Sequence, residues 1–179
     1  RFPERYVVLE VAFRLRPGGE PRLRYRELVE RAPAGASPAE VRELVLALRA
    51  SKSMLLREGD ENSQSAGSFF TNPVLSAEEA SSLFRAAIDG GIVTSSEDIP
   101  HWQVDGGKIK VAAGWLVERA GFNKGLRRGP VGLSSRHALA LIHRGGGSTR
   151  QLRALASEIQ SGVRRVFGLQ LSQEPVNWP

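Results

Sequence analysis

Residues 64–73 read QSAGSFFTNP, in which a small, flexible segment meets two adjacent phenylalanines and an Asn-Pro step. A solvent-exposed loop would not favour Phe69 next to Phe70, and a buried strand would not need Gly67. The stretch therefore fits neither an ordinary strand nor an ordinary loop. It leaves the Ser68 hydroxyl between a glycine and two large rings, which raises the question of its chemical role.

The composition indicates a folded protein with a basic surface. The chain has 179 residues, of which 41% are hydrophobic, enough for one domain or two small ones. It contains no cysteine, which excludes disulfides, thiolate metal sites and cysteine nucleophiles and fits a cytoplasmic protein. No apolar run is long enough to span a membrane. The net charge of +6 is compatible with nucleic acid, with a phosphorylated small molecule or with a merely basic surface.

Three amphipathic helices are predicted from their capping signals. Residues 37–40 (SPAE), 76–79 (SAEE) and 148–151 (STRQ) each place a serine three positions before Glu or Gln, which is a capping box. Apolar residues follow each box at intervals of three and four. Gly90 and Gly168 mark the ends of the second and third helices.

Short strands are predicted around these helices. Residues 5–16 alternate apolar with polar or small side chains from Leu9 to Leu15, which is typical of a half-buried strand. The sequence DGG at residues 105–107 indicates a hairpin turn. Strands and helices intermix without regular βαβ spacing, so the predicted fold class is α+β with mixed or antiparallel sheets. The other strand candidates are residues 109–112, 138–142 and 169–171.

A polar run at residues 57–65 (REGDENSQS) predicts a flexible linker between two units. The unit before it, one strand and one helix, is too small to bury a core alone. We therefore expect that unit to be the end of a larger domain.

Other candidate sites carry weaker signals. The three histidines lack the spacing and the thiolate partners of a zinc site, so no metal site is predicted. A hydrolase built on Ser68 would need a histidine and an acid that the sequence does not place near it. The glycine-rich residues 145–149 lack a P-loop lysine, which favours a plain loop with an N-cap over a phosphate site. The basic loop at residues 123–129 is either solvated or a clamp near an anionic ligand.

Four further stretches carry specific motifs. They are residues 4–9 (ERYVVL), 110–121 (KVAAGWLVERAG), 134–142 (SSRHALALI) and 167–174 (FGLQLSQE). Together with residues 64–73, and in order along nearly the whole chain, they resemble the MurB family, UDP-N-acetylenolpyruvoylglucosamine reductase. The family's motifs at these places include Gly-Ser-Phe-Phe-Lys-Asn-Pro, Leu-Ala-Ala-Gly-Trp-Leu-Ile and a closing Leu-Glu-Pro-Glu.

The resemblance implies a cytoplasmic flavin enzyme of peptidoglycan synthesis, and so of cell-wall biogenesis. FAD would take hydride from NADPH and pass it to UDP-N-acetylglucosamine enolpyruvate, giving UDP-N-acetylmuramate. Residues 1–57 would be the end of an FAD-binding α+β domain, and residues 58–179 the α+β substrate-binding domain. Most of the flavin domain and the family's active-site arginine are expected upstream of this chain. The resemblance also implies a monomer that binds neither nucleic acid nor a membrane.

The resemblance assigns roles to six residues by motif position. Ser68 would be the proton donor and Glu174 its acidic partner. Thr71 stands where the family usually has lysine, so one cationic contact is expected to be absent. Tyr25, Lys52 and Asn72 would contact the uridine diphosphate, and His137 would lie near the substrate.

These roles give the Ser68 hydroxyl a chemical purpose. Hydride addition leaves a carbanion or enolate, which is a strong enough base to take a proton from a serine. A small donor beside Gly67 can come close to the carbon, while Phe69 and Phe70 anchor the loop and exclude water. Glu174 could polarise the substrate carboxylate if burial held it protonated or hydrogen-bonded.

Overall fold

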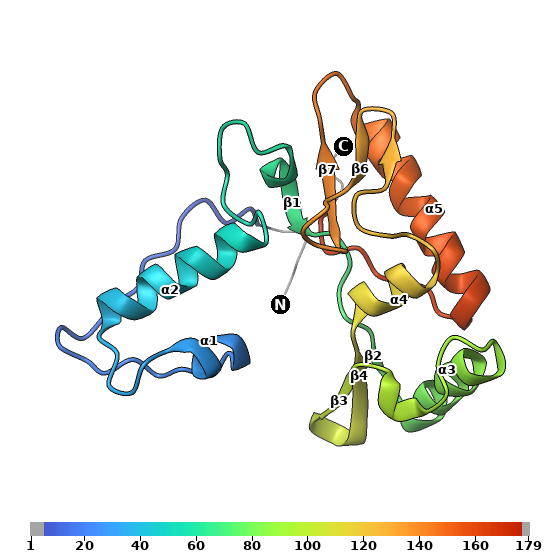
Figure 1. Cartoon of the computed structure of the whole chain (residues 1–179), viewed down its shortest axis with the longest axis horizontal. Coiled ribbons are helices and arrows are strands. Elements are labelled where there is room, and N and C mark those ends of the chain that lie inside the picture. Colours follow the sequence, from blue (N-terminus) through green and yellow to red (C-terminus); the bar gives the residue numbers. More distant parts are fainter. Residues whose placement is uncertain (1–5, 177–179) are drawn as a thin grey trace. The chain divides into compact units, whose positions relative to one another are not determined.

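The computed structural model describes residues 6–176, and the chain divides into two compact units (Figure 1). The first unit ends at Leu48 and the second begins at Arg49. Helices combined with antiparallel sheets confirm the predicted α+β class. The assignment of residues 1–57 to a flavin domain and of residues 58–179 to a substrate domain stays a prediction.

The first unit contains helix α1 (Arg26–Arg31) and most of helix α2 (Pro38–Ser51). The predicted capping box of α2 is confirmed. The N–H of Ser37 donates to Oε2 of Glu40 at 2.8 Å, and the N–H of Glu40 donates to Oγ of Ser37 at 3.3 Å. Pro38 takes the first helical position, where a missing N–H leaves no hydrogen bond unmade.

The strand predicted at residues 5–16 is wrong over the residues that the structure describes. Residues 6–16 have no regular secondary structure, and Leu9 is 93% exposed and Phe13 81% exposed. An alternating pattern shows which faces a strand would have, but the strand itself requires a hydrogen-bonded neighbour. No sheet of the described chain includes these residues. Arg5 lies outside the described residues.

The second unit is built on two antiparallel sheets. One has the strand order β1-β7-β6-β5 and the other the order β2-β4-β3. The strands are β1 (Ser65–Ser68), β2 (Val74–Leu75), β3 (His101–Val104), β4 (Lys108–Val111), β5 (Arg127–Arg128), β6 (Val131–Leu133) and β7 (Ala140–His143). The helices are α3 (Ala77–Asp89), α4 (Ala113–Arg119) and α5 (Thr149–Phe167), with short 3-10 turns η1 (Glu61–Ser63), η2 (Ser96–Asp98) and η3 (Asp105–Gly107).

Helix α5 packs on the four-stranded sheet and carries much of the core. It contacts β6, β7, α3 and α4, and Figure 1 shows it running alongside β6 and β7. Leu155 and Ile159 are buried on its inner face. Its predicted capping box is confirmed, because Ser148 Oγ accepts the N–H of Gln151 and Gln151 Oε1 accepts the N–H of Ser148. Gly168, with a φ of 69°, ends the helix as predicted.

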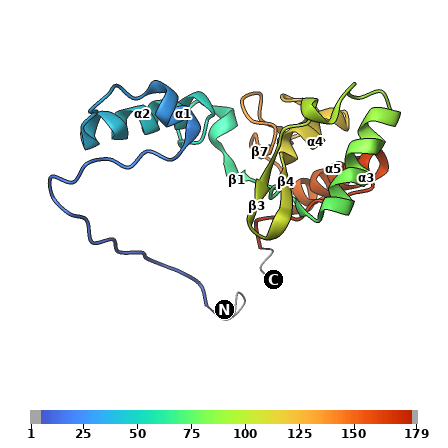
Figure 2. The ribbon, with the colours of Figure 1, turned by 90° about the horizontal axis from the view of Figure 1, so that it is seen from below.

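Helix α3 also begins and ends as predicted. The N–H of Ser76 donates to Oε2 of Glu79 at 2.7 Å, and the N–H of Glu79 donates to Oγ of Ser76 at 3.2 Å. Gly90 follows the last helical residue. Leu83 is buried, whereas Ile88, which the apolar spacing places on the same face, is exposed. Figure 2 shows α3 beside α5, which it contacts.

Two predicted strands and one predicted turn are confirmed. The strands expected at residues 109–112 and 138–142 are β4 and β7, with ends shifted by one or two residues. The DGG turn joins β3 to β4 in an antiparallel hairpin. Gly106 has a φ of 75° there, in the left-handed region that side chains with a Cβ disfavour.

The strand predicted at residues 169–171 is wrong. Its apolar residue Leu171 is buried, but the segment belongs to no sheet of the described chain. The pairing occurs slightly later, where Gln173 forms an isolated antiparallel bridge with Phe70. The apolar residues of this segment therefore indicate that it is buried next to the end of α5. They do not indicate a hydrogen-bonded strand.

The polar run at residues 57–65 is ordered, which corrects the expectation of a flexible linker. Its centre is η1, where the Asp60 carboxylate accepts the N–H of Asn62 at 2.9 Å. A hydrogen bond from the Ser53 side chain lowers the pKa of the Asp60 carboxyl. Ser63 is buried, and its hydroxyl donates to the Asp60 carbonyl at 2.8 Å. Short polar side chains thus fold the run into a compact turn that contacts β7.

Candidate active site

Ser68 ends strand β1 at a bulge that glycine makes possible. It lies opposite Ala140 of β7, and the register shifts between Ser65 and Ser68. Gly67 has a φ of 81°, although a Cβ at that position would meet no atom within 4 Å. The glycine is therefore needed for its backbone conformation rather than for space, and a bulge of this kind re-aims the next side chain.

The two phenylalanines anchor this strand end in the core. Phe69 and Phe70 are both buried, with ring centroids 5.3 Å apart in an edge-to-face arrangement. The N–H of Phe69 donates to the carbonyl of Leu139 at 2.8 Å. Successive side chains of an extended chain point to opposite faces. Both faces of the chain are therefore buried at Phe69 and Phe70, while Ser68, just before them, stays half-buried.

The last described residues return to the same strand end. The N–H of Glu174 donates to the carbonyl of Phe69 at 2.9 Å. Leu171 is buried, and its carbonyl accepts the side-chain amide of Gln160 in α5 at 2.8 Å. The segment is thus fixed at both ends. It holds the backbone of Glu174 beside the residue that follows Ser68.

The carboxyl of Glu174 is exposed, which corrects the expectation of a buried acid. Its neighbour Gln173 is half-buried, and the side-chain amide of Gln173 donates to Oε1 of Gln160 at 3.2 Å. An exposed carboxyl on a fixed backbone can contact a ligand that covers it.

His137 presents a neutral imidazole beside this strand end. Its Nδ1 accepts the N–H of Leu139 at 3.1 Å, which leaves the proton of the neutral ring on Nε2. Burial lowers the pKa of His137, and the positive charges of Lys52 and Lys124 lower it further against the opposing effect of Glu118. His137 therefore offers an N–H donor at neutral pH.

Lys52, Lys124 and His137 form a cationic cluster on the second unit. Lys52 follows the last residue of α2, and Lys124 lies in the basic loop, where it pairs with Glu118 at 3.2 Å. The charges of both lysines act on His137 and lower its pKa. Two positive charges that act on one N–H donor suit an anionic ligand, and a clamp at the basic loop stays a prediction.

The lowered pKa of His137 predicts an acid-side loss of stability. The unfolded chain, with a histidine pKa of about 6.5, takes up the proton before the folded chain does. The free energy of unfolding should therefore be unaffected by this group well above that pH and fall as the pH drops through it. His137→Gln, which keeps an acceptor for Leu139, should flatten the fall between about pH 7 and pH 5 in urea titrations.

Histidine NMR titration measures the same quantity directly. Lys52→Ala should raise the pKa of His137, because it removes one of the two nearby positive charges. A wild-type pKa at or above the unperturbed value would contradict the cationic cluster.

Asn72 has a structural partner within the second unit. Its Oδ1 accepts the N–H of Ala113 at 2.9 Å and so caps α4, whose N-cap residue Ala112 makes no side-chain cap of its own. A contact between Asn72 and uridine diphosphate stays a prediction. Tyr25 belongs to the first unit, where it is the N-cap residue of α1 and is 57% exposed, and its substrate role also stays a prediction.

Sequence reasoning missed two residues that join the parts of this site, Asn62 and Ser134. Oδ1 of Asn62 accepts the N–H of Ser135 at 2.8 Å and the hydroxyl of the buried Ser134 at 3.1 Å. The sequence does contain a signal for the turn that carries Asn62. Asp60 and Asn62 have the spacing of a turn capped by an aspartate side chain.

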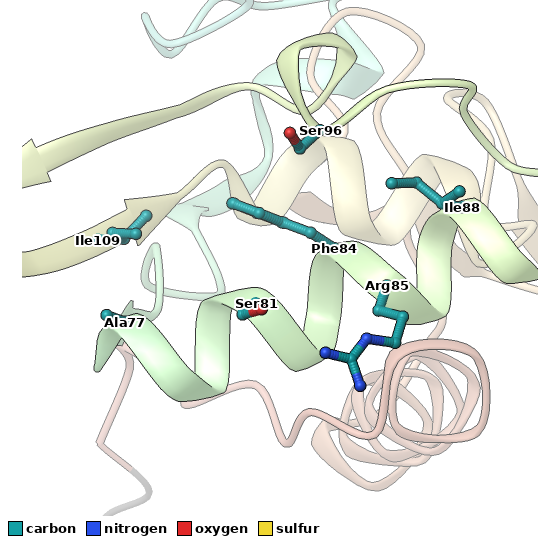
Figure 3. Close-up of a pocket in the computed structure, with 7 residues that line it drawn as sticks. All are labelled: Ala77, Ser81, Phe84, Arg85, Ile88, Ser96 and Ile109. Carbon is teal, nitrogen blue, oxygen red and sulfur yellow. The ribbon is translucent and has the colours of Figure 1, made fainter.

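A separate pocket of about 390 Å³ lies on one face of α3 (Figure 3). Phe84 crosses this face and packs on the ring of His101, with centroids 4.8 Å apart. None of the six residues with predicted roles lines the pocket. Its lining residues are Ala77, Ser81, Phe84, Arg85, Ile88, Ser96 and Ile109.

Residues 6–176 contain no group of three His, Asp or Glu side chains placed to hold a metal ion. Within the same range, none of the helices combines the length and apolar character needed to cross a bilayer.

The fold and the site together define an α+β domain whose closing segment returns to the strand end that carries Ser68. Comparison with known protein families shows to which family this domain belongs. The family described as UDP-N-acetylenolpyruvoylglucosamine reductase, C-terminal domain, matches residues 59–178, and the chain belongs to that family.

Individual relatives agree with this family. Proteins named UDP-N-acetylenolpyruvoylglucosamine reductase are 46% identical in Thermobifida fusca over 97% of this chain and 43% identical in Streptomyces coelicolor over 97% of this chain. A protein of the same name in Mycobacterium tuberculosis is 46% identical over 95% of this chain. The matches cover 49%, 46% and 47% of these relatives, so the chain spans about half their length.

Proposed function

We propose that this chain supplies the substrate-binding region and the proton donor of a reductase that forms UDP-N-acetylmuramate from UDP-N-acetylglucosamine enolpyruvate. The observation that carries the proposal is the return of the chain to Phe69, which brings the backbone of Glu174 beside the residue that follows Ser68. The names of the relatives support the substrate. The proposal includes a monomeric, cytoplasmic protein that acts in peptidoglycan synthesis.

FAD and NADPH would supply the hydride for this reaction, but the candidate phosphate loop of this chain does not fit a flavin pyrophosphate. The candidate phosphate loop at residues 145–149 uses its own donors. The N–H groups of Gly145 and Gly147 approach the two ring nitrogens of His143 at 3.1 and 3.0 Å. We therefore propose that the flavin is held away from this loop, by an FAD-binding domain of which residues 1–57 would be the end.

The residues of this chain would handle the proton. After hydride adds to one carbon of the enolpyruvyl double bond, the next carbon carries the negative charge and takes a proton from one face. The new C–H bond forms as the O–H bond of Ser68 breaks, and the serine oxygen regains a proton from water. The bulged strand end offers a small donor on a backbone that Phe69 and Phe70 anchor. Glu174 would contact the substrate carboxylate.

The cationic cluster would bind the diphosphate. Lys52 and Lys124 offer charge, and His137 offers the N–H of Nε2. Phosphate oxygens accept such donors readily, and partial burial strengthens the attraction because water screens it less. Part of the positive net charge would thus serve to bind the diphosphate.

Lys52→Ala is expected to weaken UDP-sugar binding by about 1–3 kcal/mol, because a charge-assisted hydrogen bond in a partly desolvated site would be lost. Titration calorimetry measures the change. Lys108→Ala is the matched control, since this exposed lysine lies in β4 and belongs to the other sheet of the same unit. Equal affinity in the Lys52 variant and the control would place Lys52 on a solvated helix end instead.

The proposed function is tested in protein that carries a complete flavin domain. The flavin is first reduced with NADPH and then mixed with the enolpyruvyl UDP-sugar. Reoxidation by that substrate supports the proposal. Binding without reoxidation would leave a UDP-sugar binding protein, and binding of nucleic acid with a steep salt dependence would favour a different class of protein.

A further inference from the structure

Asn62 holds the loop that carries His137. Its Oδ1 lies 2.8 Å from the N–H of Ser135, 3.2 Å from the hydroxyl of Ser135 and 3.1 Å from the hydroxyl of Ser134. Three donors around one atom identify that atom as the amide oxygen. The Asn62 backbone is itself fixed, because its N–H donates to the Asp60 carboxylate in η1.

Ser134 is fully buried, and its backbone and side-chain polar groups all have partners. Its N–H donates to the carbonyl of Ala140 at 2.9 Å, and its carbonyl accepts the N–H of Gly125 at 3.1 Å. Its hydroxyl donates to Asn62 and accepts the N–H of Arg136 at 3.0 Å. A buried polar group with this many partners fixes several chain segments at once, because any shift leaves one of them unsatisfied.

Each of the three backbone groups that bond Ser134 belongs to a residue near the candidate active site. Gly125 follows Lys124, Arg136 precedes His137, and Ala140 lies opposite Ser68. The Ser134 backbone bonds Gly125 and Ala140, and its hydroxyl ties this same residue to Arg136 and to Asn62.

We propose that Asn62 and Ser134 are a positioning pair that sets the distance between the cationic cluster and Ser68, and so governs affinity for the substrate's diphosphate. The inference rests on the proposed function. Neither residue touches the substrate in it. They act through Lys124 and His137, whose loops they hold, and removal of the pair should loosen those loops without removing any charge or reacting group.

The first test needs no enzyme activity. In the 179-residue chain, Asn62→Ala should speed hydrogen exchange of the amides of Gly125, Ser135 and Arg136 by about tenfold, the factor expected for one lost buried hydrogen bond. Asp98→Ala is the control, since the Asp98 side chain also accepts one backbone N–H and one hydroxyl, from Ser95 and Thr94, but at η2, outside the candidate site. Unchanged exchange in the Asn62 variant would overturn the proposal.

The second test uses protein with a complete flavin domain. Asn62→Ala should raise KM for the enolpyruvyl UDP-sugar about tenfold, with kcat within about twofold and flavin reduction by NADPH unchanged. Asn62→Asp keeps an acceptor oxygen and should restore KM. Ser134→Ala should also raise KM, and the two substitutions together should cost less than the sum of the single costs, because both remove the hydrogen bond between Ser134 and Asn62.

A purely structural role makes a different prediction. If Asn62 only stabilises the fold, both Asn62→Ala and Asp98→Ala should lower the melting temperature and leave KM unchanged. That result would overturn the positioning proposal, while the proposed function would stand. If wild-type protein and the Asp98 control also fail to turn over the UDP-sugar, the proposed function itself is wrong and the inference falls with it.

Discussion

Ser68→Ala is expected to slow reoxidation of the reduced flavin by the enolpyruvyl UDP-sugar by about 10²–10⁴-fold, the contribution typical of a positioned general acid. Flavin reduction by NADPH should be nearly unchanged, because the proton donor takes no part in that half-reaction. Substrate affinity should change little, since the substitution removes no charge. Stopped-flow absorbance in protein with a complete flavin domain resolves the two half-reactions.

Two further variants separate chemistry from structure. Ser68→Cys should keep part of the activity, because a thiol can give up a proton from nearly the same place. Ser65→Ala removes another hydroxyl of β1, one that accepts the N–H of Gly67 at 3.2 Å, and should cost about 1 kcal/mol of stability with near-normal reoxidation. Equal slowing of both half-reactions in Ser68→Ala, or of neither, would remove Ser68 from the proposed role.

The helices that the sequence predicts are those whose capping residues lie within a few positions of the helix end. Ser148 and Gln151 cap α5 from within four residues, so the signal is visible in a short window. Helix α4 gave no such signal, because its cap is supplied by Asn72 from a distant loop. The family motif at residues 110–121 covers this helix, yet the motif carries no statement about secondary structure.

The strand errors have one physical cause. A strand is stabilised by pairing with a segment that the local pattern does not specify. Residues 6–16 have the alternation but belong to no sheet of the described chain, and residues 169–171 have apolar burial without a ladder. Gln173, a polar residue with no strand pattern around it, is the one that pairs with Phe70.

The sequence suggested candidates for the reacting residues of the site, but it did not suggest the residues that hold them in place. Ser68 and Glu174 were assigned by motif position, and the hydrogen bond from Glu174 to Phe69 brings their backbones together. The burial expected for Glu174 is not observed. Asn62 was missed because it lies in a polar run, and composition alone does not distinguish a solvated linker from a turn whose side chains bond one another.

Gly132→Ala is expected to destabilise the fold strongly. A Cβ built on Gly132 would overlap the carbonyl oxygen of Leu126 and come within 2.5 Å of Nη1 of Arg144. Neither neighbour can move freely. The Leu126 oxygen accepts the N–H of Leu133 at 2.9 Å, and the buried Arg144 guanidinium pairs with Glu61 at 3.1 Å.

The strands would have to separate or the ion pair would have to break, so we expect a loss of about 3 kcal/mol or more in the free energy of unfolding. Gly114→Ala is the matched control. Its Cβ would lie 3.8 Å from both Ala138 and Leu139, in ordinary contact, and alanine gains up to about 1 kcal/mol over glycine inside a helix such as α4. Urea unfolding followed by tryptophan fluorescence should therefore show changes of opposite sign. A Gly132 variant as stable as wild type would mean that β5 and β6 can separate without a loss of stability. The tight packing around Gly132, which involves Arg144 and the basic loop, would then contribute little to the stability of the fold.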